Sequence, residues 1–114
     1  MEIRNNNELL CKDPRIAKSI WQQALGFMFQ RPKGSIIFIF RPARPVQLHM
    51  WFVLGPIDVV VLDSKGKVTA LKENFKPWSF WDAGIASTLI ELPAGTIRKT
   101  KTAVGDSISL PRLS

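Results

Sequence analysis

The stretch IDVVVLDSKGKVTAL, residues 57–71, decides the class of fold. Its first six residues are apolar except for Asp58, and a short apolar run bounded by turn residues is typical of a buried strand. The DSKGK segment that follows places Gly66 where a tight turn needs a positive φ. Residues 68–71 then supply a returning arm. The stretch therefore predicts a β-hairpin whose first strand is buried.

Apolar runs bounded by Gly, Pro or Asn predict further strands on both sides of this hairpin. Upstream, residues 35–40 and residues 46–54 form two such runs, and both faces of the second are mostly apolar, which favours burial on both sides. Downstream, strands are expected at residues 87–92 and 105–110. Near the N-terminus, the asparagines of NNNE favour a turn between two short strands.

One amphipathic helix is predicted over residues 13–26. Asp13 is suited to the N-cap and Pro14 to the first helical position, and Gly26 is placed to end the helix. Between them, apolar residues recur at helical spacing and form a single stripe. Residues 73–85 show no clean period and are expected to form a long aromatic loop, and residues 93–101 to hold one helical turn.

A length of 114 residues predicts a single domain over residues 1–114, since a chain of this size can bury one core. The expected architecture is mainly β (α+β): a small barrel or sandwich of about seven short strands, with one amphipathic helix near the N-terminus. One cysteine excludes a disulfide within the chain. No apolar run approaches the length of a membrane helix and no signal peptide is evident, so a soluble cytoplasmic protein is expected.

The net charge is +7, and the cations are unevenly distributed. No acid occurs between Asp13 and Asp58, a stretch that gives part of the surface a positive potential and favours anionic partners. The alternative is that the excess positive charge has no partner and only maintains solubility. The cations of this stretch are Arg15, Lys18, Arg31, Lys33, Arg41 and Arg44.

Familiar catalytic and cofactor motifs are absent from the sequence. There is no GxxxxGK phosphate loop, no GxGxxG and no GxSxG elbow. One Cys and one His cannot supply the four ligands of a structural zinc site, so neither a metal nor a cofactor is expected.

His49 and Asp58 are the polar residues most in need of an explanation. His49 borders an apolar stretch, and Asp58 interrupts an apolar run nine residues later. If the strands that carry them are neighbours across the Gly55–Pro56 turn, the two side chains could form a hydrogen-bonded core pair, since a buried aspartate must be hydrogen-bonded. The alternative is a functional His–Asp pair at the end of the sheet, beside a cationic loop.

The expected aromatic loop is a second candidate site. Lys76, Trp78, Phe80 and Trp81 combine a cation with three large rings, which suits the stacking of bases or other ligands. The alternative is a loop folded down as a plug at one end of the barrel, because buried aromatics dominate small cores.

Several pieces of the chain, taken together, resemble one family. They are GFMFQRP, IIFIF, RPVQLHMWFVLGPIDVVVLDSKGKV, ENFKPW, IELPAGT and VGDSI, in this order. The chain is similar over nearly its whole length to domain of unknown function 192, also called uncharacterised protein family 0127, and looks like its archaeal branch. The resemblance implies a mainly β domain with an N-terminal helix, and it implies no function. Asp58 matches the family's aspartate, whereas Trp51, Phe52 and Val53 replace the Lys, Asn and Thr of many members.

Three functions follow as hypotheses. The first is a non-catalytic binding module for an anionic small ligand or partner, with a cleft near His49, Asp58, Arg41, Arg44, Trp78 and Trp81. The second is a surface that contacts RNA through Arg31, Lys33, Arg41 and Arg44. The third and weakest is an acid–base enzyme that uses His49 and Asp58. Enzymatic activity is thus disfavoured but left open, and the sequence does not indicate an oligomeric state.

Overall fold

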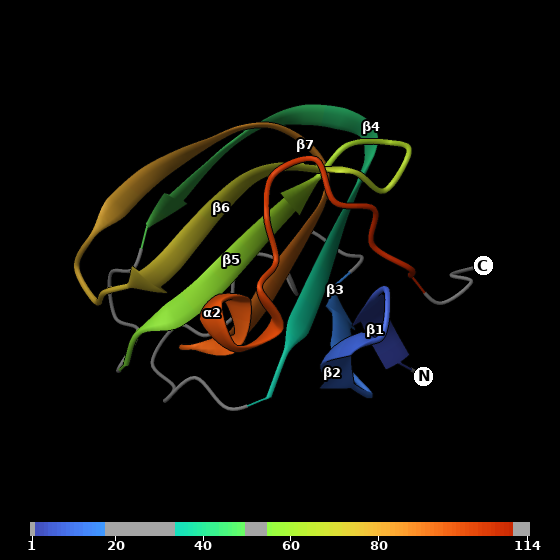
Figure 1. Ribbon diagram of the computed structural model, residues 1–114. Coiled ribbons are helices and arrows are strands. Elements are labelled where there is room, and N and C mark those ends of the chain that lie inside the picture. Colours follow the sequence, from blue (N-terminus) through green and yellow to red (C-terminus); the bar gives the residue numbers. More distant parts are fainter. Residues whose placement is uncertain (1, 18–33, 50–54, 111–114) are drawn as a thin grey trace.

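A five-stranded sheet forms the centre of the computed structural model, which describes residues 2–17, 34–49 and 55–110 (Figure 1). The strand order is β3-β4-β7-β5-β6, and every neighbouring pair is antiparallel except β3 and β4. A separate hairpin of β1 and β2 and the short helix α2 complete the described elements. Their bounds are β1 Glu2–Asn5, β2 Glu8–Lys12, β3 Arg15–Ala17, β4 Ile36–His49, β5 Ile57–Leu62, β6 Val68–Phe75, β7 Phe80–Pro93 and α2 Thr96–Thr100.

The β5–β6 hairpin forms as the sequence predicts. Gly66 has a φ of 81°, the conformation that its place in the turn requires. Asp63 fixes the turn, because its Oδ1 accepts hydrogen bonds from the backbone N–H groups of Lys65 at 2.8 Å and Lys67 at 3.0 Å. The N-terminal hairpin is confirmed as well, with Asn6 in the left-handed region at its turn.

Strand β4 differs from its prediction. Residues 36–49 form one continuous strand where two strands were expected, and residues 50–54 of the second lie outside the described residues. Its pairing with β7 is irregular at two places. At the larger, a bulge, residues 40–43 lie opposite the single residue Ser87, between the pairs Ile39–Thr88 and Arg44–Ala86, and the register shifts again between Val46 and Gln47. Gln47 is exposed, so burial on both sides is wrong for this part of β4, which has one face toward solvent.

The second half of β4 and the first half of β7 pair with one another and arch over the rest of the sheet (Figure 1). The apolar side chains beneath this arch form one core, here called the arch core. The arch contributes Ala83 and Ala86, with Val46, Leu48 and Trp81 packed beside them, and the central sheet contributes the remaining residues. These are Ile36, Phe38, Phe40, Ile57, Val59, Val61, Phe75 and Leu89.

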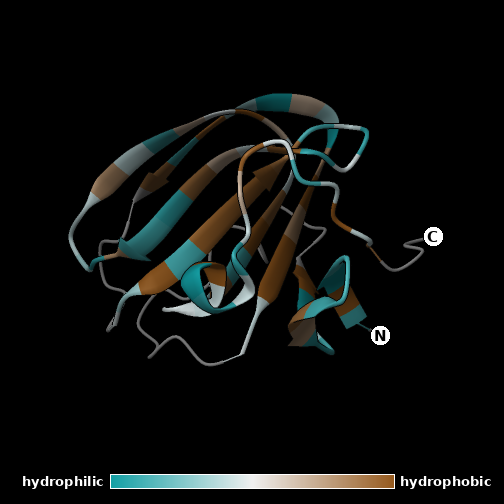
Figure 2. Ribbon diagram, viewed as in Figure 1, coloured by the Kyte–Doolittle hydropathy of each residue, from teal (hydrophilic) through white to brown (hydrophobic). Residues whose placement is uncertain are grey.

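A second core lies on the opposite face of the sheet, here called the hairpin core. It joins Val60 and Leu62 of β5 to Ile3 and Leu10 of the β1–β2 hairpin and to Ile97 of α2. Because β5 lies between the two cores, all six of its residues are buried. Figure 2 shows β5 in hydrophobic colours along most of its length. The fold class is confirmed as mainly β and sandwich-like, and the described strands do not close into a barrel.

Three further expectations were wrong in detail. Residues 15–17 form β3 instead of helix, because the Arg15 N–H donates to the Ser35 carbonyl and the segment pairs with β4; residues 18–26 of the predicted helix lie outside the described residues. Residues 73–85 form no long loop, since β6 continues to Phe75 and β7 begins at Phe80. The predicted last strand, residues 105–110, makes only isolated bridges to Arg4 and Lys67.

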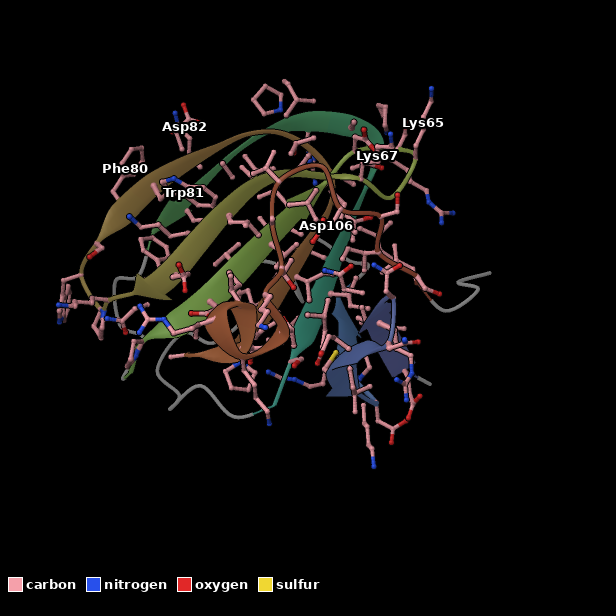
Figure 3. All side chains as sticks on the ribbon, viewed as in Figure 1. Lys65, Lys67, Phe80, Trp81, Asp82 and Asp106 are labelled. Atoms are coloured by element: carbon pink, nitrogen blue, oxygen red, sulfur yellow. The ribbon has the colours of Figure 1, made fainter. Side chains whose placement is uncertain are left out.

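Polar contacts attach the C-terminal segment to β1, in addition to the packing of Ile108 in the hairpin core. The Asn5 Nδ2 group donates to Asp106 Oδ2 at 2.8 Å, and the backbone N–H of Ala103 donates to the same oxygen at 2.9 Å. Figure 3 labels Asp106 in this segment. The predicted helical turn is confirmed as α2, which follows Gly95 directly.

Candidate ligand-binding cleft

A cleft of about 430 Å³ lies at the bulge of β4. The bulge, the β5–β6 turn and the Ser87–Thr88 segment of β7 form its walls. Its volume falls within the range of small-ligand sites. The polar lining residues are Arg41, Asp63, Ser64, Ser87 and Thr88, and the apolar ones are Ile39, Phe40, Pro42, Ala43 and Leu110, with Gly66 completing the wall.

The cleft exists because of the mismatch in register between β4 and β7. Four residues of β4 oppose only Ser87, so residues 40–43 leave the ladder and open a space above Ser87 and Thr88. Bulges often redirect side chains beside functional sites. Here the bulge places the exposed residue Arg41 in the wall of the cleft.

Cations surround this cleft. Arg41 lines it, and Lys65 and Lys67 are exposed on the β5–β6 turn that carries Asp63 (Figure 3). Asp63 is the one acid among the residues that line the cleft. Hydrogen bonds from the backbone N–H groups of Lys67 and Lys65 lower its pKa, so Asp63 is ionised at neutral pH.

Arg44 lies at the end of the same bulge. Its guanidinium carbon is 4.7 Å from the centroid of the Phe40 ring, a cation–π contact in which the ring is almost wholly buried beneath the cation. The structure therefore brings Arg41 and Arg44 to one region of the surface. The other two cations of the hypothetical RNA surface, Arg31 and Lys33, lie outside the described residues.

Asp58 lies in a different place from the cleft. It is fully buried at the start of β5, and its side chain points toward the face that carries α2. Its Oδ1 accepts the backbone N–H of Asn74 at 2.8 Å, and its Oδ2 accepts those of Gly95 at 3.1 Å and Ile97 at 2.8 Å. The carboxylate therefore joins three segments of backbone: β5, the end of β6 and the turn into α2.

The strands that carry His49 and Asp58 were expected to be neighbours in the sheet, and this expectation is wrong. Strand β7 lies between β4 and β5, so the two strands do not pair. The backbone of His49 pairs with Phe80 at the far end of the arch, whereas Asp58 pairs with Leu92. The side chain of His49 lies outside the described residues.

The two tryptophans of the aromatic segment have different environments. Trp81 is partly buried in the arch core, where its ring makes an edge-to-face contact with Phe75 at 6.4 Å between centroids. Trp78 is 68% exposed in the turn before β7, so it does not act as a plug. Figure 3 shows Trp81 with Phe80 and Asp82 at the start of β7, away from Lys65 and Lys67.

Sequence reasoning missed the polar half of the cleft. Ser87 and Thr88 gave no signal, because they meet the bulge through pairing between segments about 45 residues apart in the sequence. Asp63 was assigned only to a turn. The DSKGK segment nonetheless carried a usable signal, since it combines a carboxylate, a hydroxyl and two cations within five residues.

Glu91 was also missed, although it lies in the IELPAGT piece. It is 8% exposed, and its Oε2 atom accepts no hydrogen bond within the part of the chain that the structure describes. It pairs with Ile36 on one side and Val59 on the other. Burial raises the pKa of this carboxyl to about 8, while the nearby Arg15 charge opposes the change.

The described residues contain neither a cluster of metal ligands nor a membrane-spanning helix. Within residues 2–17, 34–49 and 55–110, no three His, Cys, Asp or Glu side chains gather as metal ligands would. In the same ranges, no helix has the length and apolar character needed to cross a membrane.

The sequence matches one family model over residues 1–110, that of DUF192, described as "Uncharacterized ACR, COG1430". This chain belongs to that family. A UPF0127 protein of the archaeon Pyrococcus horikoshii is 35% identical over 97 residues, which cover 82% of this chain and 84% of that protein. The resemblance found in the sequence is therefore confirmed, and the family's description assigns no function.

Two solved structures share the fold. One, described as a "putative transcription regulator" from Sinorhizobium meliloti, has a TM-score of 0.76 and 27% identity, covering 82% of this chain and 78% of that one. The other, a protein of unknown function from Novosphingobium aromaticivorans, has a TM-score of 0.80 over 90% of this chain and 76% of that one. At 20% identity, the second likeness concerns the fold alone.

Proposed function

We propose that this protein is a non-catalytic binding module for an anionic small ligand, which binds in the cleft at the β4 bulge. The observation that carries the proposal is that Arg41 lines one cleft of about 430 Å³ together with three hydroxyl-bearing residues, Ser64, Ser87 and Thr88. A guanidinium and hydroxyls are the donors that proteins use for carboxylates and phosphates.

The charges around the cleft support an anion. Arg41, Lys65 and Lys67 outnumber the single lining carboxylate, and the net charge of the chain is +7. A positive potential concentrated at a concave site raises the local concentration of anions. An acid–base enzyme built on His49 and Asp58 has weaker support, because the Asp58 carboxylate is buried and accepts three backbone N–H groups.

The test is an NMR titration of the ¹⁵N-labelled protein with inorganic phosphate and with citrate. We expect saturable shifts at the backbone amides of Arg41, Ser64 and Thr88, since binding changes the environment of these walls. Arg41→Ala is expected to weaken binding about tenfold or more, because a charge-assisted contact is lost.

Lys99→Ala is the matched control, since it removes one exposed positive charge from α2. Helix α2 lies at the Asp58 end of β5, and the cleft lies at the Leu62 end. Equal weakening by the two variants would reduce the effect to net charge and contradict a site at the bulge.

A second candidate is contact with RNA through the cationic surface. The observation that favours it is the exposure of Arg41 and Arg44 on the bulge, together with that of Trp78 and Phe80 at the far end of the arch. Solvent-facing cations and rings suit phosphate contact and base stacking.

Binding of a mixed single-stranded RNA pool at several salt concentrations tests the alternative. If both arginines contact phosphates, the double variant Arg41→Ala with Arg44→Ala should reduce the slope of log K against log salt by roughly 1.5. An unchanged slope would exclude these two residues from RNA contact.

A further inference from the structure

Asp63 is the feature of the cleft that a simple anion site does not explain. A carboxylate in the wall repels a bound anion, so its presence needs another reason. Its role in the turn uses only half of its capacity, because both turn hydrogen bonds end on Oδ1. The Oδ2 atom keeps its ability to accept a hydrogen bond from a ligand.

The donor that meets this oxygen should be uncharged. Lys65 and Lys67 follow Asp63 in the turn, and Arg41 lines the same cleft. An additional ammonium group would approach three cations and only one carboxylate, whereas a hydroxyl can donate to Oδ2 without a charge of its own.

The apolar wall of the cleft is aliphatic on its accessible side. Phe40 is only 7% exposed beneath the Arg44 guanidinium, so its ring offers little stacking surface. Ile39, Pro42 and Leu110 are more accessible and line the cleft. A saturated carbon chain fits such a wall better than a flat aromatic ring does.

From these three observations, and resting on the proposed function, we propose that the ligand is a short aliphatic hydroxy acid. Its carboxylate binds Arg41 and the neighbouring hydroxyl side chains, its hydroxyl donates to Asp63 Oδ2, and its carbon chain lies against Ile39, Pro42 and Leu110. The volume of the cleft suits a molecule of this size.

A matched series of probes tests the class by isothermal titration of the wild-type protein. Hexanoate has the anion and the chain, 3-hydroxyhexanoate adds a neutral donor, and 3-aminohexanoate adds a cationic donor. We expect 3-hydroxyhexanoate to bind about tenfold more tightly than hexanoate, as one hydrogen bond to a carboxylate provides. We expect 3-aminohexanoate to bind no better than hexanoate.

Asp63→Asn sharpens the assignment. The amide keeps an oxygen that can accept the two turn hydrogen bonds, and it replaces the second acceptor by an NH₂ group. In this variant the advantage of 3-hydroxyhexanoate over hexanoate should disappear, while hexanoate itself should bind at least as tightly as before.

The outcomes separate the two proposals. Equal affinity of hexanoate and 3-hydroxyhexanoate, or tightest binding of 3-aminohexanoate, would overturn the hydroxy-acid class while leaving an Arg41-dependent anion site. The absence of binding by all three acids, together with the absence of an Arg41-dependent response to phosphate, would overturn the proposed function itself.

Discussion

Two aspartates at opposite ends of β5 have opposite environments. Asp58 lies at the start of β5, is fully buried and accepts three backbone N–H groups. Asp63 follows the end of β5, lies in a surface turn and accepts two hydrogen bonds, both on one oxygen. The same residue type thus joins backbone segments of the fold at one end of the strand and lines a cleft at the other.

The difference teaches how to separate a structural carboxylate from an available one. A buried carboxylate is tolerated only when donors of the protein satisfy it, so its oxygens already accept hydrogen bonds from the protein and are not available to a ligand. A carboxylate at a turn can share its oxygens between the backbone and solvent. Exposure and the count of remaining acceptors distinguish the two cases, whereas position beside an apolar run does not.

The largest expected effect comes from Asp58→Ala. Removing the carboxylate leaves three backbone N–H groups without their acceptor in the interior, and we expect a loss of about 3–5 kcal/mol in the free energy of unfolding. Urea unfolding followed by tryptophan fluorescence measures it.

Asp82→Ala is the control for Asp58→Ala, since it removes an exposed acid that accepts a hydrogen bond from the Gly84 N–H. A loss below about 1 kcal/mol for Asp58→Ala would mean that these contacts contribute little, and the contrast between the two ends of β5 would fail.

Glu91 sharpens the comparison because it is buried beside Val59 and its Oε2 atom, unlike either oxygen of Asp58, accepts no hydrogen bond among the described residues. Its pKa rises from 4.5 to about 8 on folding, so between these values the folded state keeps a proton that the unfolded state has released. Stability should therefore fall as pH rises from about 4.5 to about 8, by about 4 kcal/mol.

Glu91→Gln removes this titration and should flatten the curve of unfolding free energy against pH over that range. The exposed residue Glu73 provides the control, since Glu73→Gln should leave the slope of the wild type intact. A wild-type stability that is constant from pH 5 to pH 8 would contradict a protonated Glu91.

The smallest effect is expected at Asp63. Asp63→Ala removes two hydrogen bonds in an exposed turn, so its urea midpoint should stay much closer to that of the wild type than the midpoint of Asp58→Ala. In a carboxyl NMR titration Asp63 should titrate below its usual value of 3.8, because its backbone donors stabilise the charged form. A midpoint above 3.8 would contradict the turn geometry.

The local elements could be predicted from the sequence. The DSKGK turn, the asparagine turn after β1 and the helical turn after Gly95 each depend on a few adjacent residues, and all three formed. The start of the predicted helix failed for the opposite reason: pairing of residues 15–17 with β4 overrides the capping signal of Asp13 and Pro14.

The arch and the cleft could not be predicted in the same way. A single sequence does not reveal that Arg44 pairs with Ala86, so it does not reveal the four-residue bulge before Arg44. The polar lining of the candidate site could not be predicted for the same reason. Arg41 and Arg44 were selected for their charge, whereas Ser87 and Thr88 became visible only when β7 was placed beside the bulge.

The pairing of β4 with β7 also has a consequence for biosynthesis. Ile36 pairs with Glu91, a residue that the ribosome adds 55 residues later. At about 5–20 residues per second, the first strand of this pair waits roughly 3–11 seconds for its partner. Residues 15–17 are already synthesised and can pair with one edge of IIFIF, but its other edge has no partner during that interval, and an open apolar strand edge exposes a nascent chain to aggregation.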